Sequence, residues 1–356
     1  MINSGNSMQA AVLYGPDDLR LEWRPVPEAV PGSVILKVDA CAICGSDLRI
    51  LKSGNPRITE PRIIGHEIAG TVVEVGEGCD KFGVGDRVSV GADIPCGKCH
   101  HCIDGHANNC DVNLAIGYQF EGGFAEYIRL DPVVVQYGPV KRFSAVLSSA
   151  EAALAEPLGC CINGFETVYM TKGVSVAVFG AGPIGIMLIS LAKSLYGSKQ
   201  VISIEPQAQR RATALKYGAD FAIDPTVNNT HEFIMNITGG AGIDRVFTAC
   251  PAVKTHEQAV AMIAKRGFVN LFGGLSKGSQ PIQIDSNWLH YREAYLTGSH
   301  GATPAHHARA LELIEQGVID AKGFITHEVP LNRIVEGFRI AASGAAIKVV
   351  INAELR

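Results

Sequence analysis

Four cysteines stand close together in the sequence, at Cys96, Cys99, Cys102 and Cys110. This C-x2-C-x2-C-x7-C spacing lets four thiolates converge tetrahedrally on one Zn2+ ion. Four thiolates close the coordination shell, so the pattern predicts a structural site with no position for water or substrate. An iron–sulfur cluster fits less well, because the bacterial ferredoxin run has about three residues before its last cysteine and a proline after it, whereas here Asp111 follows Cys110.

A second set of metal-binding residue types is spread over three short segments. Cys44 lies in C-G-S-D, His66 and Glu67 lie in G-H-E, and Glu156 lies in A-E-P. One thiolate, one imidazole and one carboxylate neutralise Zn2+ and leave a fourth position open, as catalytic zinc requires. Each segment alone is a weak signal, because a single Cys or His on an apolar strand is more often a packed core residue.

A glycine-rich segment, G-A-G-P-I-G, follows a hydrophobic strand and opens a predicted helix. The pattern is typical of a dinucleotide-binding turn, in which the first glycine permits the tight turn, the second admits the pyrophosphate and the third lets helix and strand pack closely. The predicted cofactor-binding residues of this turn are Gly180, Gly182, Pro183, Ile184 and Gly185.

Glu205 ends the next predicted strand, twenty residues after Gly185. A carboxylate there binds the hydroxyls of the adenosine ribose and repels a 2′-phosphate, which favours NAD(H) over NADP(H). Arg210, predicted to contact the cofactor, and Arg211 follow closely and leave NADP(H) as the less favoured alternative.

Two kinds of segment position these residues. Short strands broken by Gly and Pro fill the chain from about residue 9 to 131, whereas strands and helices alternate from about 174 to 298. Alternation of this kind predicts a parallel sheet covered by helices on both faces. An apolar strand at 348–351 ends the chain and could rejoin the first region, so the α/β domain would be an insertion in a domain built from both termini.

The composition limits the possible partners. A net charge of -4 over 356 residues gives no basic surplus for nucleic acid. The uncharged stretch between Lys172 and Lys193 is interrupted by glycines and reads as strand, turn and helix rather than a membrane span. Met1 to Ser7 lack the features of a signal peptide. With ten cysteines and no secreted context, we expect a reducing compartment, the cytoplasm.

Together these residues resemble the zinc-containing medium-chain dehydrogenases, the group of alcohol, sorbitol, threonine and galactitol-phosphate dehydrogenases. The most specific match is G-H-E-x2-G-x5-G-x2-C over residues 65–79, with the cysteine quartet next in the expected order. The resemblance implies that Cys44, His66 and Glu156 bind a catalytic zinc, with Glu67 beside the metal as an exchangeable ligand. Two zinc ions per chain and a homodimer or homotetramer are therefore expected.

The same resemblance implies the fold and its boundaries. A Rossmann domain, a doubly wound α/β parallel sheet over residues 159–297, is inserted into a β-rich, GroES-like catalytic domain made of residues 1–158 and 298–356. Ser46 resembles the hydroxyl that takes the substrate proton, and Asp47 resembles the acid that orients the ligand His. Many members have His at the position of Arg49, which cannot carry a proton near neutral pH. Water or a cofactor ribose hydroxyl would complete the relay, or Arg49 binds an anionic group.

The expected function is hydride transfer between NAD(H) and a secondary alcohol or its ketone, with a polyol, sugar or sugar derivative as substrate. A simple alcohol or threonine-type dehydrogenase is the alternative within the family. Two other classes are considered: a zinc-ribbon interaction module, which would usually show two C-x2-C pairs and a basic face, and a non-catalytic nucleotide sensor, which should lack Cys44, His66 and Glu156.

Overall fold

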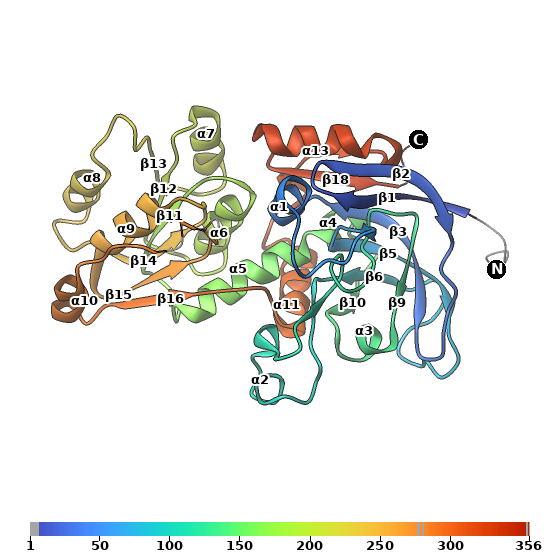
Figure 1. The fold of residues 1–356 in the computed structure, drawn as a ribbon. Coiled ribbons are helices and arrows are strands. Elements are labelled where there is room, and N and C mark those ends of the chain that lie inside the picture. The colour runs from blue at the N-terminus through green and yellow to red at the C-terminus, as the bar shows by residue number, and fades with distance from the viewer. Residues whose placement is uncertain (1–6, 276–277, 280, 354, 356) are drawn as a thin grey trace. The chain divides into compact units, whose positions relative to one another are not determined.

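The computed structural model describes residues 7–275, 278–279, 281–353 and 355, and it divides the chain into two compact units (Figure 1). Unit 1 comprises residues 1–160 and 301–356, and unit 2 comprises residues 161–300. These boundaries lie within three residues of those expected from the sequence. The segment Met1 to Ser7, on which the signal-peptide prediction rests, lies almost wholly outside the described residues.

Unit 2 is built on a six-stranded parallel sheet in the order β13-β12-β11-β14-β15-β16. The strands are β11 (Ser175–Phe179), β12 (Gln200–Ile204), β13 (Phe221–Ile223), β14 (Ile243–Thr248), β15 (Ile263–Leu271) and β16 (Tyr295–Gly298). The strand order reverses direction between β11 and β14, which creates the switch point at which α/β sheets bind ligands. The predicted doubly wound Rossmann sheet is confirmed.

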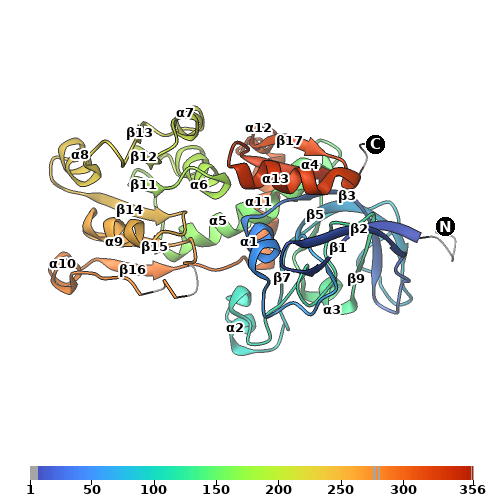
Figure 2. The same cartoon turned by 45° about the horizontal axis from the view of Figure 1, so that its top comes forward.

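Five helices connect these strands. They are α6 (Pro183–Ser194), α7 (Ala208–Lys216), α8 (Thr230–Ile237), α9 (Val253–Ala261) and α10 (Ser286–Arg292). Because parallel crossovers are right-handed, the reversal at the switch point places α6 and α7 on one face and α9 and α10 on the other (Figure 2). The sequence pattern predicts a helix near residues 255–263, but α9 ends at Ala261. Ile263 already pairs with Ile243 as the first residue of β15.

Unit 1 is β-rich, as expected. Its main sheet has the order β10-β6-β5-β3-β18-β17, with β9 pairing with β3, and a smaller sheet has the order β2-β1-β4. The bounds are β1 (Ser7–Gly15), β2 (Asp18–Pro25), β3 (Val34–Ala42), β4 (Arg62–Ile63), β5 (Glu67–Val75), β6 (Arg87–Val90), β9 (Tyr127–Leu130), β10 (Val140–Arg142), β17 (Ile325–Val329) and β18 (Lys348–Asn352). The terminal strand β18 pairs with β3, so the prediction that the chain returns to its first domain is confirmed.

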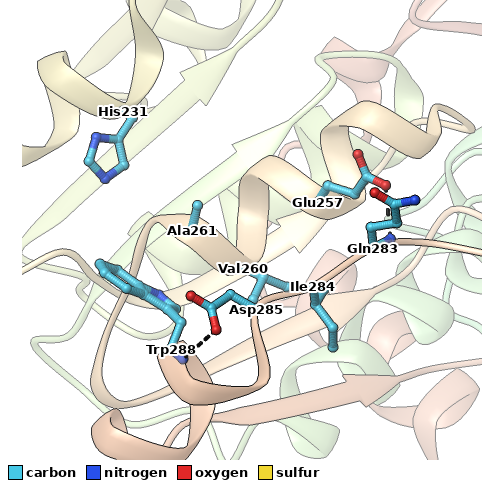
Figure 3. A pocket seen from close by; sticks show the side chains of 8 residues that line it. All are labelled: His231, Glu257, Val260, Ala261, Gln283, Ile284, Asp285 and Trp288. Carbon is cyan, nitrogen blue, oxygen red and sulfur yellow. Dashed lines mark hydrogen bonds between the residues drawn. The ribbon is translucent and has the colours of Figure 1, made fainter.

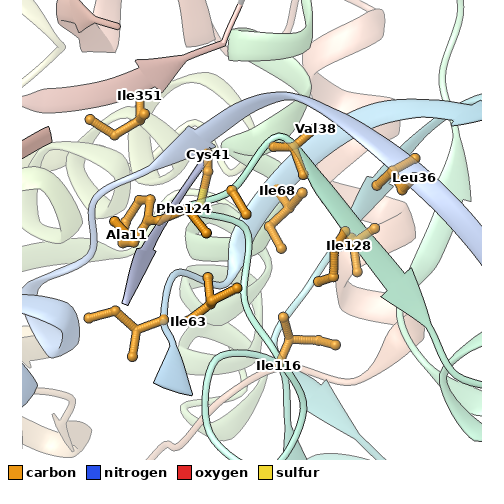
Figure 4. Packing of buried hydrophobic residues seen from close by; sticks show 14 of the residues in the cluster. Ala11, Leu36, Val38, Cys41, Ile63, Ile68, Ile116, Phe124, Ile128 and Ile351 are labelled. Carbon is orange, nitrogen blue, oxygen red and sulfur yellow. The ribbon is translucent and has the colours of Figure 1, made fainter. Parts of the chain in front are cut away.

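The core of unit 1 gathers apolar side chains from these strands, with Phe124, Ile68 and Cys41 fully buried among them (Figure 4). The apolar run at 124–130 predicts one strand, but β9 begins only at Tyr127. Before it, the backbone N–H groups of Gly122, Gly123 and Phe124 donate to the carbonyls of residues 63–65, and Ala125 pairs with Ala10 of β1 only as an isolated bridge.

Short helices and two short strands complete unit 1. They are α1 (Gly45–Ser53), β7 (Asp93–Ile94), α2 (His100–Ile103), β8 (Leu114–Ala115), α3 (Pro132–Tyr137), α4 (Ser149–Ala153), α11 (Pro304–Glu315), α12 (Ala321–Phe324) and α13 (Ile334–Ser343). A longer helix, α5 (Ala155–Thr167), contains the boundary between the units. Helices α1 and α5 are among those that the residue pattern does not predict. Among the described residues, no helix is both long and apolar enough to cross a membrane.

Candidate active site and cysteine lobe

Cys44 and His66 are brought together at the start of helix α1. Cys44 is the N-cap residue, and its backbone N–H donates to Asp47 Oδ2 at 2.9 Å. The other oxygen of this fully buried carboxylate, Oδ1, lies 3.4 Å from His66 Nδ1. Burial opposes protonation of His66, but Asp47 outweighs it and holds the pKa of the ring well above its usual value. Asp47 therefore orients both residues and leaves His66 Nε2 for another partner.

Glu67 is the third donor of this cluster. One ligand atom each from Cys44, His66 and Glu67 lies within 4.8 Å of the others, a spread that one metal ion could bridge. Lys348 Nζ lies 2.6 Å from both oxygens of Glu67, and the two side chains are 3% and 0% exposed. Glu67 is therefore already neutralised by a buried cation from the other end of the chain. Sequence reasoning missed Lys348, which offers no local signal beyond being a lysine at the head of an apolar strand.

Glu156 lies in the first turn of α5 and is buried. Burial, together with the nearby charges of Glu67 and Asp93, raises the pKa of its carboxyl to about 8 against the opposing charges of His66 and Lys348. Its hydrogen-bond partner is the thiol of Cys160, which donates to Oε1 at 3.7 Å. The structure groups Glu67 rather than Glu156 with Cys44 and His66. Among the described residues Glu156 forms no ion pair, and the charges of His66 and Lys348 do not offset its burial. A divalent ion would stabilise its ionised form and therefore fits this set.

The hydroxyl of Ser46 lies 3.3 Å from His66 Nε2, next to the position that a metal on this nitrogen would occupy. Tyr118, a residue missed from the sequence, has its ring centroid 6.1 Å from that of His66, and burial raises the pKa of its hydroxyl. Arg49 is exposed on α1. It makes no hydrogen bond or ion pair with the residues that the structure describes, so its role stays a prediction.

The four cysteines converge in a separate lobe. Their sulfurs are 3.5 Å apart for Cys99 and Cys102, and 3.9 Å apart for Cys96–Cys102 and Cys99–Cys110. Four sulfurs held at 2.3 Å from one zinc ion lie about 3.8 Å apart, so the lobe fits a closed tetrahedral site. Backbone N–H groups of residues 96, 112 and 113 overcome the effect of burial and lower the pKa of Cys110 to about 6, which favours the thiolate that zinc binds.

In unit 2 the glycine turn has the expected form. Gly180 adopts φ +92° directly after β11, and Gly182 is the N-cap of α6 with Pro183 and Ile184 next in the helix. A Cβ at Gly185 would lie 1.9 Å from the Gly180 carbonyl oxygen, whereas a Cβ at Gly182 would meet nothing within 4 Å. Gly185 thus serves packing, and Gly182 keeps open the space that a pyrophosphate needs.

Glu205 is tied to this turn. The backbone N–H of Ala181 donates to Oε2 at 2.8 Å and that of Gln207 donates to Oε1 at 2.9 Å. Arg211 is engaged elsewhere, because it lies 2.9 Å from Asp224 and donates to backbone carbonyls.

A pocket of about 280 Å³ also lies in unit 2, lined by residues of α8, α9 and the segment entering α10 (Figure 3). Its lining residues are His231, Glu257, Val260, Ala261, Gln283, Ile284, Asp285 and Trp288. None of them belongs to the glycine turn or to its acidic partner. The Asp285 carboxylate is the N-cap of α10 and accepts the backbone N–H groups of Asn287 and Trp288.

Comparison with known proteins matches both parts of the chain to one family. Residues 30–137 match the alcohol dehydrogenase GroES-like domain, and residues 183–316 match the zinc-binding dehydrogenase domain. The chain belongs to the zinc-dependent medium-chain alcohol dehydrogenase family. Its GroES-like and Rossmann architecture follows from the same matches.

Three relatives illustrate the range of this family. A sorbitol dehydrogenase of Halalkalibacterium halodurans is 32% identical, covering 95% of this chain and 96% of the relative. An L-threonine 3-dehydrogenase of Pyrococcus furiosus is 36% identical over 95% of both chains. A zinc-binding dehydrogenase of Sinorhizobium meliloti, solved with NADP, superposes with a TM-score of 0.90 at 30% identity, covering 98% of this chain and 99% of the other. The chain is thus a dehydrogenase-family oxidoreductase.

Proposed function

We propose that this chain is a zinc-dependent, NAD(H)-linked dehydrogenase that oxidises a secondary alcohol of a polyol, sugar or sugar derivative. The observation that carries the proposal is the donor cluster of Cys44, His66 and Glu67 with the Ser46 hydroxyl 3.3 Å from the imidazole. The cluster combines a metal position with a hydroxyl that can move a proton.

Zinc held by Cys44, His66 and a carboxylate would lower the pKa of a substrate hydroxyl. Ser46 accepts the proton of that hydroxyl and passes its own to the next acceptor. Asp47 keeps the imidazole in place through Nδ1. Glu156 is the proposed third ligand, because Glu67 is already paired with Lys348 while Glu156 is buried without such a partner. Glu67 remains available to exchange with it.

NAD(H) is proposed as the cofactor because the Glu205 carboxylate faces the glycine turn and carries a charge that disfavours a 2′-phosphate. The NADP bound in the Sinorhizobium meliloti structure keeps NADP(H) as the alternative. A polyol substrate is supported by the sorbitol dehydrogenase relative and by the carboxylate-containing ligand set. A threonine-type activity is the second candidate, supported by the relative at 36% identity. A homodimer or homotetramer remains proposed.

The test is NAD+ and NADP+ reduction by the purified, zinc-analysed protein against polyols, sugar acids, sugar phosphates, L-threonine and simple alcohols. We expect NAD+ reduction with a polyol or sugar derivative, and its loss after chelation with recovery on adding Zn2+. Preference for L-threonine would replace the substrate assignment. A fully zinc-loaded protein that binds NADH and turns over none of the compounds would count against the enzyme proposal and favour a nucleotide-sensing role.

A further inference from the structure

Outside both predicted zinc sites, a third group of metal-ligand side chains lies on the surface of the cysteine lobe. We propose that His100, His101 and Asp111 form a binding site for one divalent transition-metal ion. One ligand atom from each residue lies within 4.8 Å of the other two. The assignment concerns a site distinct from the four sulfurs, and it does not depend on dehydrogenase activity.

The separations suit one ion. His100 Nδ1 lies 3.7 Å from Asp111 Oδ2, and His101 Nε2 lies 3.9 Å from Asp111 Oδ1. Both distances are too long for hydrogen bonds. Two ligand atoms each about 2.1 Å from a metal lie about 3.0 to 4.2 Å apart for ligand angles between 90° and 180°. Both imidazoles therefore face the carboxylate at distances that coordination would satisfy.

The backbone of the lobe holds the three residues in place. His100 and His101 open α2, whose N-cap is Cys99. Asp111 directly follows Cys110, and its backbone N–H forms a hydrogen bond to the sulfur of Cys99. The two histidines thus follow Cys99, and Asp111 follows Cys110. Binding of zinc by the four cysteines would therefore fix the histidines relative to the carboxylate. A site whose ligands are already positioned loses less entropy on binding.

The chemistry of the donors defines the class of ion. Two imidazoles and one carboxylate suit Zn2+, Ni2+, Co2+ or Cu2+, whereas Mg2+ and Ca2+ prefer oxygen ligands. The side chains are 66%, 38% and 57% exposed for His100, His101 and Asp111, so water completes the coordination shell and the ion enters directly from solvent. The ion would bridge α2 and the segment after Cys110, and would therefore stabilise the lobe.

The test is titration of the full-length protein, as purified with its zinc, with Ni2+ by calorimetry and with Cu2+ by electron paramagnetic resonance. We expect one additional saturable ion per chain and nitrogen hyperfine coupling from imidazole. His100→Asn, His101→Asn and Asp111→Asn should each weaken binding on the order of tenfold or more. His106→Asn removes an exposed histidine of the same lobe that lies outside the cluster, and it should leave the affinity unchanged.

Zinc content and melting temperature are measured for every variant, because Asp111 also contacts Cys99 through its backbone. Exposed His100 and His101 should be replaceable without loss of fold, so they keep the test decisive if Asp111→Asn unfolds the lobe. The absence of a saturable additional ion, or equal weakening in His101→Asn and His106→Asn, would overturn the proposal and leave the cluster as a surface ion pair.

Discussion

Charge compensation decides what the buried residues of the active site can do. Glu67 and Lys348 are almost fully buried and neutralise each other, so their pairing holds without a metal. Among the described residues, Glu156 accepts a hydrogen bond from the Cys160 thiol and forms no ion pair, and burial raises its pKa to about 8. A divalent cation would stabilise its ionised form. The two carboxylates therefore differ in their need for zinc, although the sequence places both in plausible ligand segments.

At the same scale, Glu205 is expected to set cofactor choice. Glu205→Ser removes the charge that opposes a 2′-phosphate, so the NADP+ to NAD+ ratio of kcat/KM should rise on the order of tenfold. Glu205 also accepts hydrogen bonds from two backbone N–H groups at the turn, so NAD+ affinity should fall as well. The NADP+ to NAD+ ratio of kcat/KM is therefore the decisive measurement. If the wild type already preferred NADP+, the assignment to Glu205 would be wrong, and Arg210 or Arg211 would be the candidate determinant.

His307 predicts an acid-sensitive stability. It is 1% exposed, and burial lowers the pKa of its ring to about 4. Ser89 donates its only proton to the Ala152 carbonyl, so His307 Nε2 donates to Ser89, and burial keeps the ring neutral at pH 7. In the unfolded chain the His307 ring binds a proton near pH 6.5. Stability is therefore highest above that pH, and the free energy of unfolding falls by about 3 kcal/mol in total as the pH is lowered toward 4.

The measurement is the free energy of unfolding between pH 7 and pH 4, for the wild type and for His307→Gln. Glutamine can still donate to Ser89 but cannot be protonated near these pH values. The free energy of unfolding of His307→Gln should therefore fall less between pH 7 and pH 4 than that of the wild type. Parallel slopes for the two proteins would show that other groups cause the acid sensitivity.

Among the helices and strands, the starts of two helices position residues of the candidate sites. Helix α1 exposes Cys44 at its N-cap, and the turn before α6 leaves an open space at Gly182 while filling the space at Gly185. The cysteine lobe is organised by its own sulfur contacts. Each of these elements has a separable role, so substitutions in them should fail in different ways.

The two glycines of the α6 turn give a matched pair. Gly182→Ala should fold with a nearly unchanged melting temperature, because its Cβ meets no atom, but NADH binding should weaken by at least about tenfold as the methyl group enters the pyrophosphate space. Gly185→Ala should instead lower stability by several kcal/mol, because its Cβ overlaps the Gly180 carbonyl. Melting temperature and NADH fluorescence titration distinguish them. Normal NADH affinity in Gly182→Ala would place the pyrophosphate elsewhere.

Cysteines from the two metal clusters should also behave differently. Cys44→Ala should keep its fold and its NADH binding, yet lose turnover by orders of magnitude, because an open site activates substrate. Cys99→Ala should lower the melting temperature and disturb the lobe, because a closed site contributes folding free energy. Zinc content, melting temperature, NADH binding and turnover are compared for both. Near-normal turnover in Cys44→Ala with unchanged zinc would refute the proposed mechanism.

At the scale of the whole molecule, the last strand completes the first unit. Strand β18 lies between β3 and β17, and its first residue, Lys348, supplies the buried partner of Glu67. The chain therefore completes unit 1 only with a segment that follows unit 2. This closure explains why a domain built from both termini needs an apolar C-terminal strand.

Truncation tests this closure. A chain ending at Ile347 should be insoluble or lack a cooperative unfolding transition, because it loses a central strand and leaves Glu67 buried without its cation. A chain ending at Ala353 keeps β18, including the hydrogen bond from the Ala353 N–H to the Asp39 carbonyl, and serves as the control. Circular dichroism and thermal melts decide between them. Cooperative unfolding of the shorter chain at the wild-type temperature would contradict the role assigned to β18.

Features that depend on local spacing can be predicted from the residues alone. The cysteine quartet, the glycine turn with Glu205 and the alternation of strands and helices each lie within a short stretch, and their geometry follows from residue type and separation. The family, the doubly wound sheet and the return of the C-terminal strand could therefore be predicted. Boundaries such as Phe124 and Ile263 could not, because the partners that decide them lie in other segments.

The pairing of polar groups that lie far apart in the chain depends on the tertiary fold. Lys348 and Glu67 are 281 residues apart, and the sheet that joins β5, β3 and β18 places them together. The same packing gives Glu67 a cation, leaves Glu156 with a thiol, and sets Tyr118 beside His66. Hydrophobic periodicity specifies which faces are buried but not which charged groups meet there, because that depends on the register between strands far apart in the chain.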